Sequence, residues 1–590
     1  MSTTKNDFFD QKVLGHPAGL FVLFFTEMWE RFSFYGMRAI LVLFLTSSLV
    51  DGGWAWERKT ALALYGTYTS MVYLTPIIGG FVADRYLGSR KAVLLGAFIM
   101  FLGHASMAIE TPFFLYAGLL CLILGNGFFK PNMTSIVSQL YKDYQQKKDA
   151  AYTIFYMGVN SGAFLGMMLC GYIGEEVGWS YGFGLAGIFM LLGLIMFYYF
   201  QNIFGDVGEK PIIEARSGKV DKESLDSNLI NSNDLHLDGD KRNPFLLIDK
   251  LMMFAAAAIA LVWIINDPMS KIYNYNIFGS DQVANYVILA AVIIFVTLLF
   301  SRLSRFSSIT RDRLIALCII AFFYMLFWAA FEQAGGSMNI FAKDYVNRGL
   351  TGSFATTFKT INTLLTVVPL AIITWVLTRL TASTFKKYSI ANIVVLISFS
   401  LIWMIVIWMV NKEYSKENTE VKATWFQILN SFFIITLAPF FTKIWESKFN
   451  PPVAIKYAFG MVFLGLGFYA LSYGSSDIPL GAKTASVSMI WLVIAYLFHT
   501  MGELCISPVG LSNVSKLVPG RMISIMFGVW YLSVAIGNKI AGKMGGEMDS
   551  ITETSGMGHF FWIFTIVPLC AAVLVFIAHP LLKKLMHGVK

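Results

Sequence analysis

The sequence predicts an all-α polytopic membrane protein made of two six-helix bundles and about four additional transmembrane helices. Of its 590 residues, 56% are hydrophobic and only 14% are charged, whereas about 25% of the residues in a soluble domain are charged. Apolar stretches long enough to cross a bilayer core of about 30 Å recur along the whole chain. This composition excludes a water-soluble globule.

The apolar stretches fall into groups that define the expected domains. We expect a first six-helix bundle in residues 1–204, a polar cytoplasmic linker at 205–243 and two inserted helices at 244–302. Residues 303–590 are expected to hold the second bundle, with an additional helix pair near 355–410. The predicted spans lie near 17–48, 60–83, 91–109, 112–140, 151–176, 180–204, 245–266, 282–301, 313–341, 355–379, 388–410, 424–445, 453–473, 484–516, 520–545 and 558–586.

The distribution of charge predicts the orientation of the chain in the membrane. Its formal net charge is +9, and the lysines and arginines concentrate in the short loops between spans. Because cytoplasmic loops are enriched in these residues, we expect a multi-pass protein of the inner (plasma) membrane with both termini in the cytoplasm. The same distribution explains the positive charge without a nucleic-acid partner.

An internal repeat relates the two halves. The stretches 125–140 and 502–517 each have a glycine six residues before a proline, and a serine and a leucine follow at matching offsets. A second echo follows each stretch, FYMGVNSG from Phe155 and WYLSVAIG from Trp530. Parallel repeats of this kind place a substrate site near the bilayer midplane, between the two halves.

Charged residues inside the apolar spans are the main candidates for function, because each costs at least about 2.5–3.5 kcal/mol to insert. In the first span, Glu27, Glu30 and Arg31 have the spacing i, i+3, i+4 and share one helical face, and Arg38 follows two turns later. Such a cluster can hold a proton, although a static ion pair between helices is the alternative. Lys130 lies in the fourth span and needs a counter-charge, for which Glu27 or Glu30 is available.

The second half contributes acids rather than bases. Glu332 and Glu503 lie in otherwise apolar spans, opposite the cations Arg31, Arg38 and Lys130 of the first half. This polarity suits a zwitterion such as a peptide with free ends. Neutral groups that could contact a peptide backbone or line a pocket, each also explicable as a packing or interfacial residue, are Tyr35, Tyr73, Asn160, Trp328, Asn430, Ser507 and Trp530.

Other chemistry has no support in the sequence. His499 lies one turn before Glu503, where a proton relay is conceivable, but a histidine hydrogen-bonded to a backbone carbonyl is the more common case. No metal-ligand spacing, Walker loop or nucleophile elbow is present. We therefore expect a protein that is not an enzyme and uses no metal or cofactor.

The chain resembles the proton-dependent oligopeptide transporters, the peptide branch of the major facilitator superfamily. The resemblance rests on the ExxER triplet within EMWERFSFYGMRAIL, on FKPN, FWAAFEQAG, WFQILN and GELCISP, and on the basic loop GGFVADRYLGSRK. It implies the major facilitator fold and proton-coupled import of di- and tripeptides by alternating access. Protons would be the coupling ion, membrane lipid would surround the protein, and a monomer would be the working unit.

The resemblance also implies a role for each candidate residue. Proton coupling would involve Glu27, Glu30, Arg31, Lys130 and Glu332, and Arg38 with Glu332 would form an extracellular gate. The peptide carboxylate would be drawn by the cations of the first half and the amino terminus held by Glu503. The peptide-binding set would be Arg31, Tyr35, Arg38, Tyr73, Lys130, Asn160, Trp328, Asn430, Glu503, Ser507 and Trp530.

Three departures from the family pattern and two alternatives remain. Gly66 stands where mammalian members carry a histidine, and Ser431 stands where a proline usually follows the asparagine, which leaves the shape of that helix open. The helix pair near 355–410 is not part of the usual prokaryotic layout. Plant members of the family carry nitrate or other small anions, so the cargo could differ. A membrane-embedded enzyme or a structural scaffold would be a different class, which the paired intramembrane charges disfavour.

Overall fold

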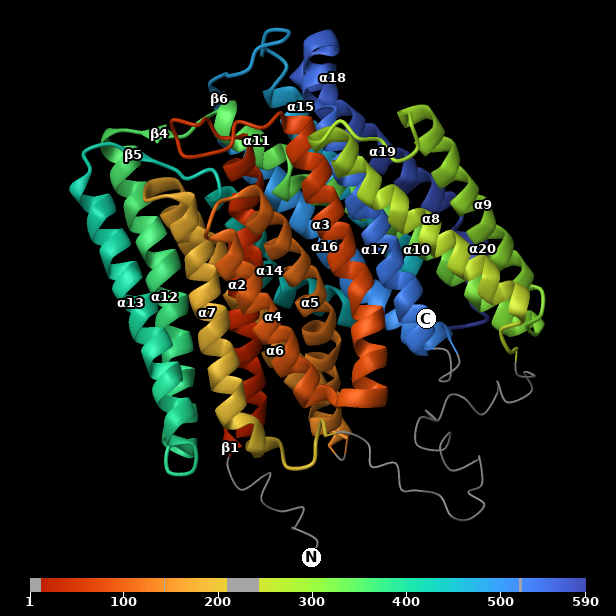
Figure 1. Cartoon of the computed structure of the whole chain (residues 1–590), viewed down its shortest axis with the longest axis horizontal. Helices are drawn as coiled ribbons and strands as arrows, with labels where there is room; N and C mark the ends of the chain where they lie inside the picture. The colour runs from red at the N-terminus through yellow and green to blue at the C-terminus, as the bar shows by residue number, and fades with distance from the viewer. Residues whose placement is uncertain (1–11, 143, 210–242, 519–522, 590) are drawn as a thin grey trace, which may run out of the picture.

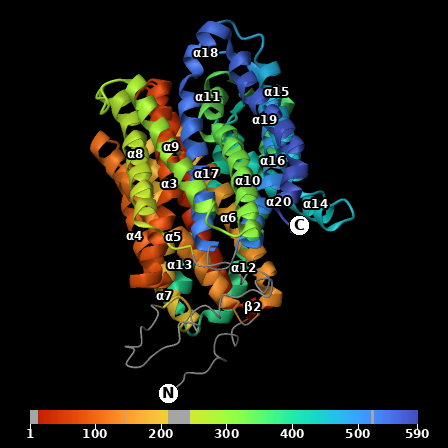
Figure 2. The same cartoon turned by 90° about the vertical axis from the view of Figure 1, so that its right-hand side faces the viewer.

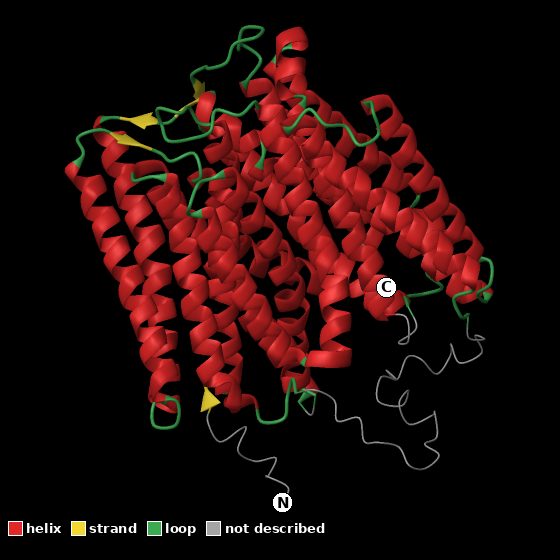
Figure 3. Ribbon diagram, viewed as in Figure 1, coloured by secondary structure: helices red, strands yellow, loops and turns green. Residues whose placement is uncertain are grey.

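The computed structural model describes residues 12–142, 144–209, 243–518 and 523–589. Helices make up most of this part of the chain (Figure 3). Within it, thirteen helices are long and apolar enough to cross a membrane. Three more run beside them, α2 (Ala18–Thr46), α3 (Arg58–Val82) and α17 (Ile523–Gly546), which gives the sixteen helices expected from the sequence. Most of the predicted linker at 205–243 lies outside the described residues.

The first half of the chain forms one bundle of six helices. Its members are α2, α3, α4 (Ser89–Met107), α5 (Pro112–Leu140), α6 (Gln145–Glu176) and α7 (Trp179–Phe200). A short π-helix, η1 (Ala83–Leu87), follows α3, and a 3-10 turn, η2 (Gln201–Phe204), follows α7. Helices α2 and α6 pack closely because Gly162 has no side chain: a Cβ there would lie 2.2 Å from the carbonyl oxygen of Met28.

The second bundle is built from α10 (Ser308–Phe331) and the helices that follow the second insertion. These are α14 (Trp425–Glu446), α15 (Val453–Gly474), α16 (Ile490–Leu517), α17 and α19 (Met557–Ile577). Helix α18 (Met548–Ser555) connects the last two. Pro131 in α5 and Pro508 in α16 both lie inside helices, at matching places of the two bundles, as the internal repeat predicts.

Two spans that we predicted as continuous helices are broken. The span 313–341 consists of α10, the 3-10 turn η4 (Glu332–Gly335) and α11 (Ser337–Asp344), and the interruption falls at Gly335 and Gly336, which favour helix ends. The span 558–586 consists of α19 and α20 (His579–Leu585). Pro580 lies in the first turn of α20 and has no backbone N–H with which to continue α19.

The two inserted hairpins flank opposite sides of the core (Figure 1). Helices α8 (Leu247–Ile272) and α9 (Asp281–Leu303) form one, and α8 packs along α3. Helices α12 (Gly352–Thr384) and α13 (Ser389–Ser415) form the other. Although α12 and α13 belong to the second half of the sequence, α13 packs on α7 and α2 of the first bundle, with the Phe399 ring 5.6 Å from the Phe25 ring.

The two bundles meet along two helix pairs, α3 with α17 and α6 with α14. At the first of these contacts the backbones nearly touch, because a Cβ on Gly66 would lie 2.8 Å from the Cα of Gly542. A histidine at residue 66 would have no room in this arrangement. Figure 2 shows α3 and α17 beside one another in the side view as well.

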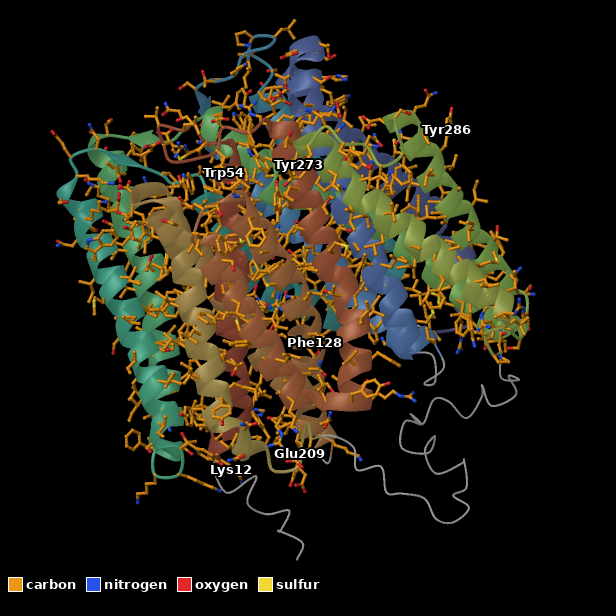
Figure 4. All side chains as sticks on the ribbon, viewed as in Figure 1. Lys12, Trp54, Phe128, Glu209, Tyr273 and Tyr286 are labelled. Carbon is orange, nitrogen blue, oxygen red and sulfur yellow. The ribbon has the colours of Figure 1, made fainter. Side chains whose placement is uncertain are left out.

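Short strands close the end of the molecule that lies opposite the N-terminus, here called the distal end. There β3 (Val346–Asn347) pairs in parallel with β6 (Val487–Ser488), and β4 (Gly349–Leu350) pairs antiparallel with β5 (Thr419–Glu420). At the other end, β1 (Lys12–Val13) pairs with β2 (His16–Pro17). Figure 4 shows Trp54, Tyr273 and Tyr286 near the distal end and Lys12 and Glu209 at the opposite end. Aromatic residues at this level are typical of a membrane interface.

Candidate functional site

A triplet of charged residues is buried on α2. The Nε atom of Arg31 lies 2.8 Å from Oε1 of Glu27 and 2.8 Å from Oε2 of Glu30, so both carboxylates share one guanidinium. Asn126 of α5 donates from Nδ2 to the other oxygen of Glu30 at 3.3 Å. The predicted common face is therefore confirmed. Two acids and one base leave a surplus negative charge in a buried site, and one proton would remove it.

Lys130 of α5 does not form the direct link to Glu27 or Glu30 that we considered. Among the described residues it has no ion pair, and its Nζ atom lies 4.3 Å from the ring centroid of Tyr73. It remains within electrostatic reach of the triplet on α2 and of Glu332. The aromatic ring provides a cation–π contact that a carboxylate ligand could supplement. Lys130 thus remains available for an anionic partner that the described residues do not supply.

Arg38 and Glu332 connect the two bundles. Their Nη2 and Oε2 atoms are 2.7 Å apart, and both side chains are buried, so the predicted contact is present. Tyr65 of α3, which sequence reasoning missed, accepts a hydrogen bond from Arg38 Nε at 2.8 Å and donates to Glu332 Oε2 at 3.4 Å. Gly335 makes room for this ring, since a Cβ there would lie 1.9 Å from the tyrosine oxygen.

A second carboxylate of the C-terminal bundle is held by neutral groups. Glu503 of α16 accepts a hydrogen bond at 2.9 Å from Nδ2 of Asn430, which also donates to Thr500 Oγ1 at 3.1 Å. Helix α14 runs unbroken through Asn430 and Ser431, where the chain departs from the family pattern. Glu503 is half-buried, so the amide positions a carboxylate that is still accessible.

Tyrosines lie between these charged groups. The ring of Tyr35 is 5.6 Å from the guanidinium carbon of Arg38, and this tyrosine is within electrostatic reach of both Glu332 and Glu503. Tyr156 of α6 is 49% exposed and lies near Tyr35 and Glu503. Sequence reasoning used Tyr156 only as part of the repeat and missed it as a site residue, because a tyrosine in an apolar span is also a common interfacial anchor.

The other predicted binding residues differ in how accessible they are. Trp328 and Ser507 are half-buried, and each has a polar atom without a hydrogen-bond partner among the described residues. Trp530 is only 1% exposed and stacks on Tyr324 with the ring centroids 4.3 Å apart, so it contributes packing rather than accessible surface. The amide of Asn160 donates to the carbonyl of Tyr156 in its own helix at 3.0 Å.

His499 takes part in neither of the arrangements considered for it. Its ring packs against Phe468 with the centroids 4.4 Å apart, and neither ring nitrogen has a hydrogen-bond partner among the described residues. A relay to Glu503 therefore has no direct contact, and no backbone carbonyl binds the ring. Across the part of the chain that the structure describes, no group of His, Cys, Asp or Glu side chains could hold a metal ion.

Further ion pairs join the bundles at the distal end. Arg58 of α3 contacts Asp344 and Asp549 of the second half, each at 2.6 Å. At the other helix contact, Glu176 at the end of α6 binds Lys422 and lies 2.9 Å from Lys416. These ion pairs hold the two bundles together at the distal end.

The pKa of Lys416 reflects its place in this charge cluster. Burial acts to lower it, but the neighbouring carboxylates of Glu176 and Glu413 outweigh burial and raise the pKa above its usual value. The lysine is therefore held in its charged form. The ion pair between Lys416 and Glu176 at the distal end of α6 is therefore kept at neutral pH.

The fold and the site define a class of protein. Two six-helix bundles cross the membrane side by side, and charged groups from both meet where the bundles touch. Buried ionisable groups are costly in a membrane and mark pathways for ions and substrates. This is the arrangement of a polytopic membrane transporter.

Comparisons with known proteins give the family. The sequence model of the POT family matches residues 90–422 and 401–563. The peptide transporter YePEPT of Yersinia enterocolitica is 29% identical over 596 residues, which cover 100% of this chain and 99% of the relative. The di-/tripeptide transporter of Lactococcus lactis subsp. cremoris is 27% identical, again over 100% and 99%. The chain belongs to the POT family, the proton-dependent oligopeptide transporters.

Solved structures agree with this assignment. A crystal structure of the peptide transporter POT in complex with sulfate matches with a TM-score of 0.69 and 27% identity, and covers 100% of both chains. A POT family transporter in complex with 5-aminolevulinic acid matches with a TM-score of 0.71 and 25% identity, over 99% of this chain and 100% of the other. The major facilitator fold is thereby confirmed.

Proposed function

We propose that the protein is a symporter that imports di- and tripeptides together with protons, by alternating access between the two bundles. Its distal end would face the outside of the plasma membrane and both termini the cytoplasm. A single chain would be the working unit, surrounded by membrane lipid. Protons would be the coupling ion, without any other cofactor.

The separation of charge between the bundles is the observation that carries this proposal. Lys130, a cation without an ion-pair partner among the described residues, comes from the N-terminal bundle. Glu503, a carboxylate held only by neutral groups, comes from the C-terminal bundle. A peptide with free ends carries one charge of each sign, so it would bridge these two residues. Bridging favours the state in which the bundles close around the cargo.

Proton coupling is supported by the contrast between the triplet and the gate. The triplet on α2 lies within one helix, while the Arg38–Glu332 pair crosses between bundles. We propose that a proton on Glu27 or Glu30 frees Arg31 to bind the peptide carboxylate. Neutralising Glu332 would release Arg38 and let the distal end open.

The relatives are consistent with a zwitterionic cargo. Two of them are named as a peptide transporter and a di-/tripeptide transporter, and a solved neighbour holds 5-aminolevulinic acid, a molecule with one amino and one carboxyl group. A small inorganic anion would leave Glu503 without a positive partner. For this reason we favour peptides over nitrate or related anions.

Uptake of labelled dialanine into proteoliposomes with an imposed inward proton gradient tests the proposal. We expect accumulation that a protonophore abolishes and that excess unlabelled dipeptide, but not nitrate, competes away. Uptake equal to that of the protonophore control would reject symport. Competition by nitrate alone would reject the peptide as cargo.

A further inference from the structure

A large apolar cavity lies between the α8–α9 hairpin and the transport core, beside the contact of α8 with α3. Its volume is about 930 Å³, and its walls come from α3, α8, α9, α10 and α17. The lining runs from Met253 to Ile264 on α8 and from Ile288 to Leu303 on α9, which is about 16 Å and about 22 Å of helix at 1.5 Å per residue. The cavity is therefore as long as one leaflet of a bilayer core of about 30 Å.

The hairpin touches the core on either side of this cavity. Towards the distal end, Lys539 of α17 forms an ion pair with Asp267 of α8 at 2.5 Å and donates to Thr67 of α3 at 2.8 Å. Near the other end, α9 packs against α10. Between these contacts the lining is almost entirely apolar, with aromatic side chains at residues 263 and 295 and alanines at residues 256, 260 and 291.

Neither water nor empty space suits such walls. Water needs two to four polar partners in a cavity, which alanine, leucine and isoleucine side chains do not offer. An empty space of this size would forfeit the packing contacts of every side chain that lines it. The helices that form the cavity cross a membrane, so acyl chains are the apolar molecules present at high concentration around it.

A positive charge lies at the end of the cavity near the last turn of α9. Arg302, which lines the cavity, and its neighbour Arg305 share the single carboxylate of Asp249, at 3.5 Å and 2.8 Å. One unit of positive charge is left over at this end. At the other end, Lys539 is neutralised by Asp267. The cavity is therefore electrically polarised along its length.

The guanidinium of Arg302 keeps one edge free. Its Nη1 atom donates to Asn243 Oδ1 at 2.9 Å and to the carbonyl of Pro244 at 2.9 Å, and Nη2 donates to the carbonyl of Asn243 at 2.8 Å. Among the described residues, no acceptor faces the Nε hydrogen or the second Nη2 hydrogen. These two parallel N–H groups form the fork with which arginine binds a phosphate.

We propose that this cavity is a binding site for an anionic glycerophospholipid. The acyl chains fill the space between the hairpin and the core, and the phosphate accepts hydrogen bonds from the free edge of Arg302. The lipid adds to the packing of α8 on α3 and fills the space that the hairpin leaves towards α10 and α17. The hairpin and the core are thereby held together by a bound lipid as well as by the Lys539–Asp267 pair.

Native mass spectrometry of the full chain in mild detergent, titrated with phosphatidylglycerol or phosphatidylcholine, tests the site. We expect one tightly bound phosphatidylglycerol, with phosphatidylcholine binding about tenfold more weakly for lack of net negative charge. Equal binding of the two lipids to the unaltered protein would overturn the charge argument.

Variants that fill the cavity test its location. Ala256→Leu with Ala260→Phe should reduce phosphatidylglycerol binding about tenfold or more, because these side chains occupy the space of the acyl chains. Ala258→Phe is the matched control, since Ala258 lies on the same helix, is exposed and does not line the cavity. Equal lipid binding by the filled variant and this control would overturn the proposal.

Arg302→Gln provides a test that does not depend on packing. It should abolish the preference for phosphatidylglycerol over phosphatidylcholine while the acyl chains still bind. If the filled double variant does not fold, Ala291→Leu and Arg302→Gln still decide the outcome. A preference that persists in Arg302→Gln would exclude the assigned position of the phosphate.

Discussion

The two bundles hold their buried charges in opposite ways. In the N-terminal bundle, Glu27 and Glu30 find their base on the same helix, where Arg31 lies 2.8 Å from each. In the C-terminal bundle, Glu332 takes its base from the other bundle, and Glu503 is held by an amide. The triplet therefore has its base on its own helix, whereas the two acids of the C-terminal bundle depend on partners outside their own helix.

In the proposed mechanism, this difference separates charges that would respond to motion from charges that would respond to protons. A rigid rotation of one bundle against the other would leave the distances within α2 unchanged, so the rotation by itself would not alter the triplet. The same rotation breaks the contact between Arg38 and Glu332, because these residues lie on different bundles. The predictions below break or sharpen this contrast, beginning with the largest expected effect.

Replacing only one partner of the Arg38–Glu332 pair between the bundles should strongly destabilise the protein. Arg38→Ala or Glu332→Ala alone should each destabilise the protein by about 3–5 kcal/mol, because a buried charge is left without its partner, and the double variant should lose less than the sum. Thermal unfolding in detergent measures this coupling. The exposed pair Lys59 and Glu547, 2.8 Å apart, is the control and should show about 0–1 kcal/mol. Additive losses at Arg38 and Glu332 would contradict the prediction.

Removing an acid from the internal triplet should affect coupling alone. Glu30→Gln should lower gradient-driven accumulation of a dipeptide about a hundredfold, since an amide cannot take part in proton transfer. Peptide counterflow, which needs no net proton movement, should persist. Both are measured in proteoliposomes, with the exposed Glu446→Gln as control. Loss of counterflow as well would indicate a defect in binding or folding.

The acid of the C-terminal bundle should distinguish peptides by their amino end. Glu503→Gln should weaken binding of peptides with a free amino group about tenfold, the value of a hydrogen bond to a charged group, and leave amino-blocked peptides unaffected. Competition against labelled dialanine uptake gives both affinities. Glu553→Gln, at an exposed position of α18, should change neither. Equal losses for both kinds of peptide would exclude Glu503 from amine recognition.

The smallest effect is expected at the tyrosine that supports the gate. Tyr65→Phe removes a hydroxyl that contacts both Arg38 and Glu332 but leaves their 2.7 Å ion pair in place. We expect a loss of about 1 kcal/mol, measured as a lower unfolding temperature. Tyr86→Phe, at a residue that is 57% exposed, serves as control. A loss as large as that of Arg38→Ala would show that the tyrosine, rather than the ion pair, holds the bundles together.

Sequence reasoning succeeded where a single helix decides the geometry. The spacing of Glu27, Glu30 and Arg31 fixes their common face, because side chains three and four residues apart are neighbours on any α-helix. The hydrophobic stretches gave all sixteen helices, since the membrane sets their length. The Arg38–Glu332 contact followed from the family resemblance, and not from either residue alone.

Sequence reasoning failed for contacts between different helices. Tyr65 and Tyr156 carry no pattern of their own, and only their neighbours reveal them. We expected Lys130 to pair with a carboxylate because charges in a membrane need a partner. Its ammonium group instead lies over the ring of Tyr73. The packing of α13 on the N-terminal bundle likewise has no signal in the sequence, where this helix belongs to the second half.

The sequence by itself determined the class, the number of spans and the family, because hydrophobic length and short motifs are local properties of the chain. Only the tertiary structure decided which acid meets which base, where the inserted hairpins lie and that a cavity lies between one of them and the core. Ion pairs between helices depend on interhelical distances of a few ångströms. No local pattern encodes such distances, since they follow from how all the helices pack together.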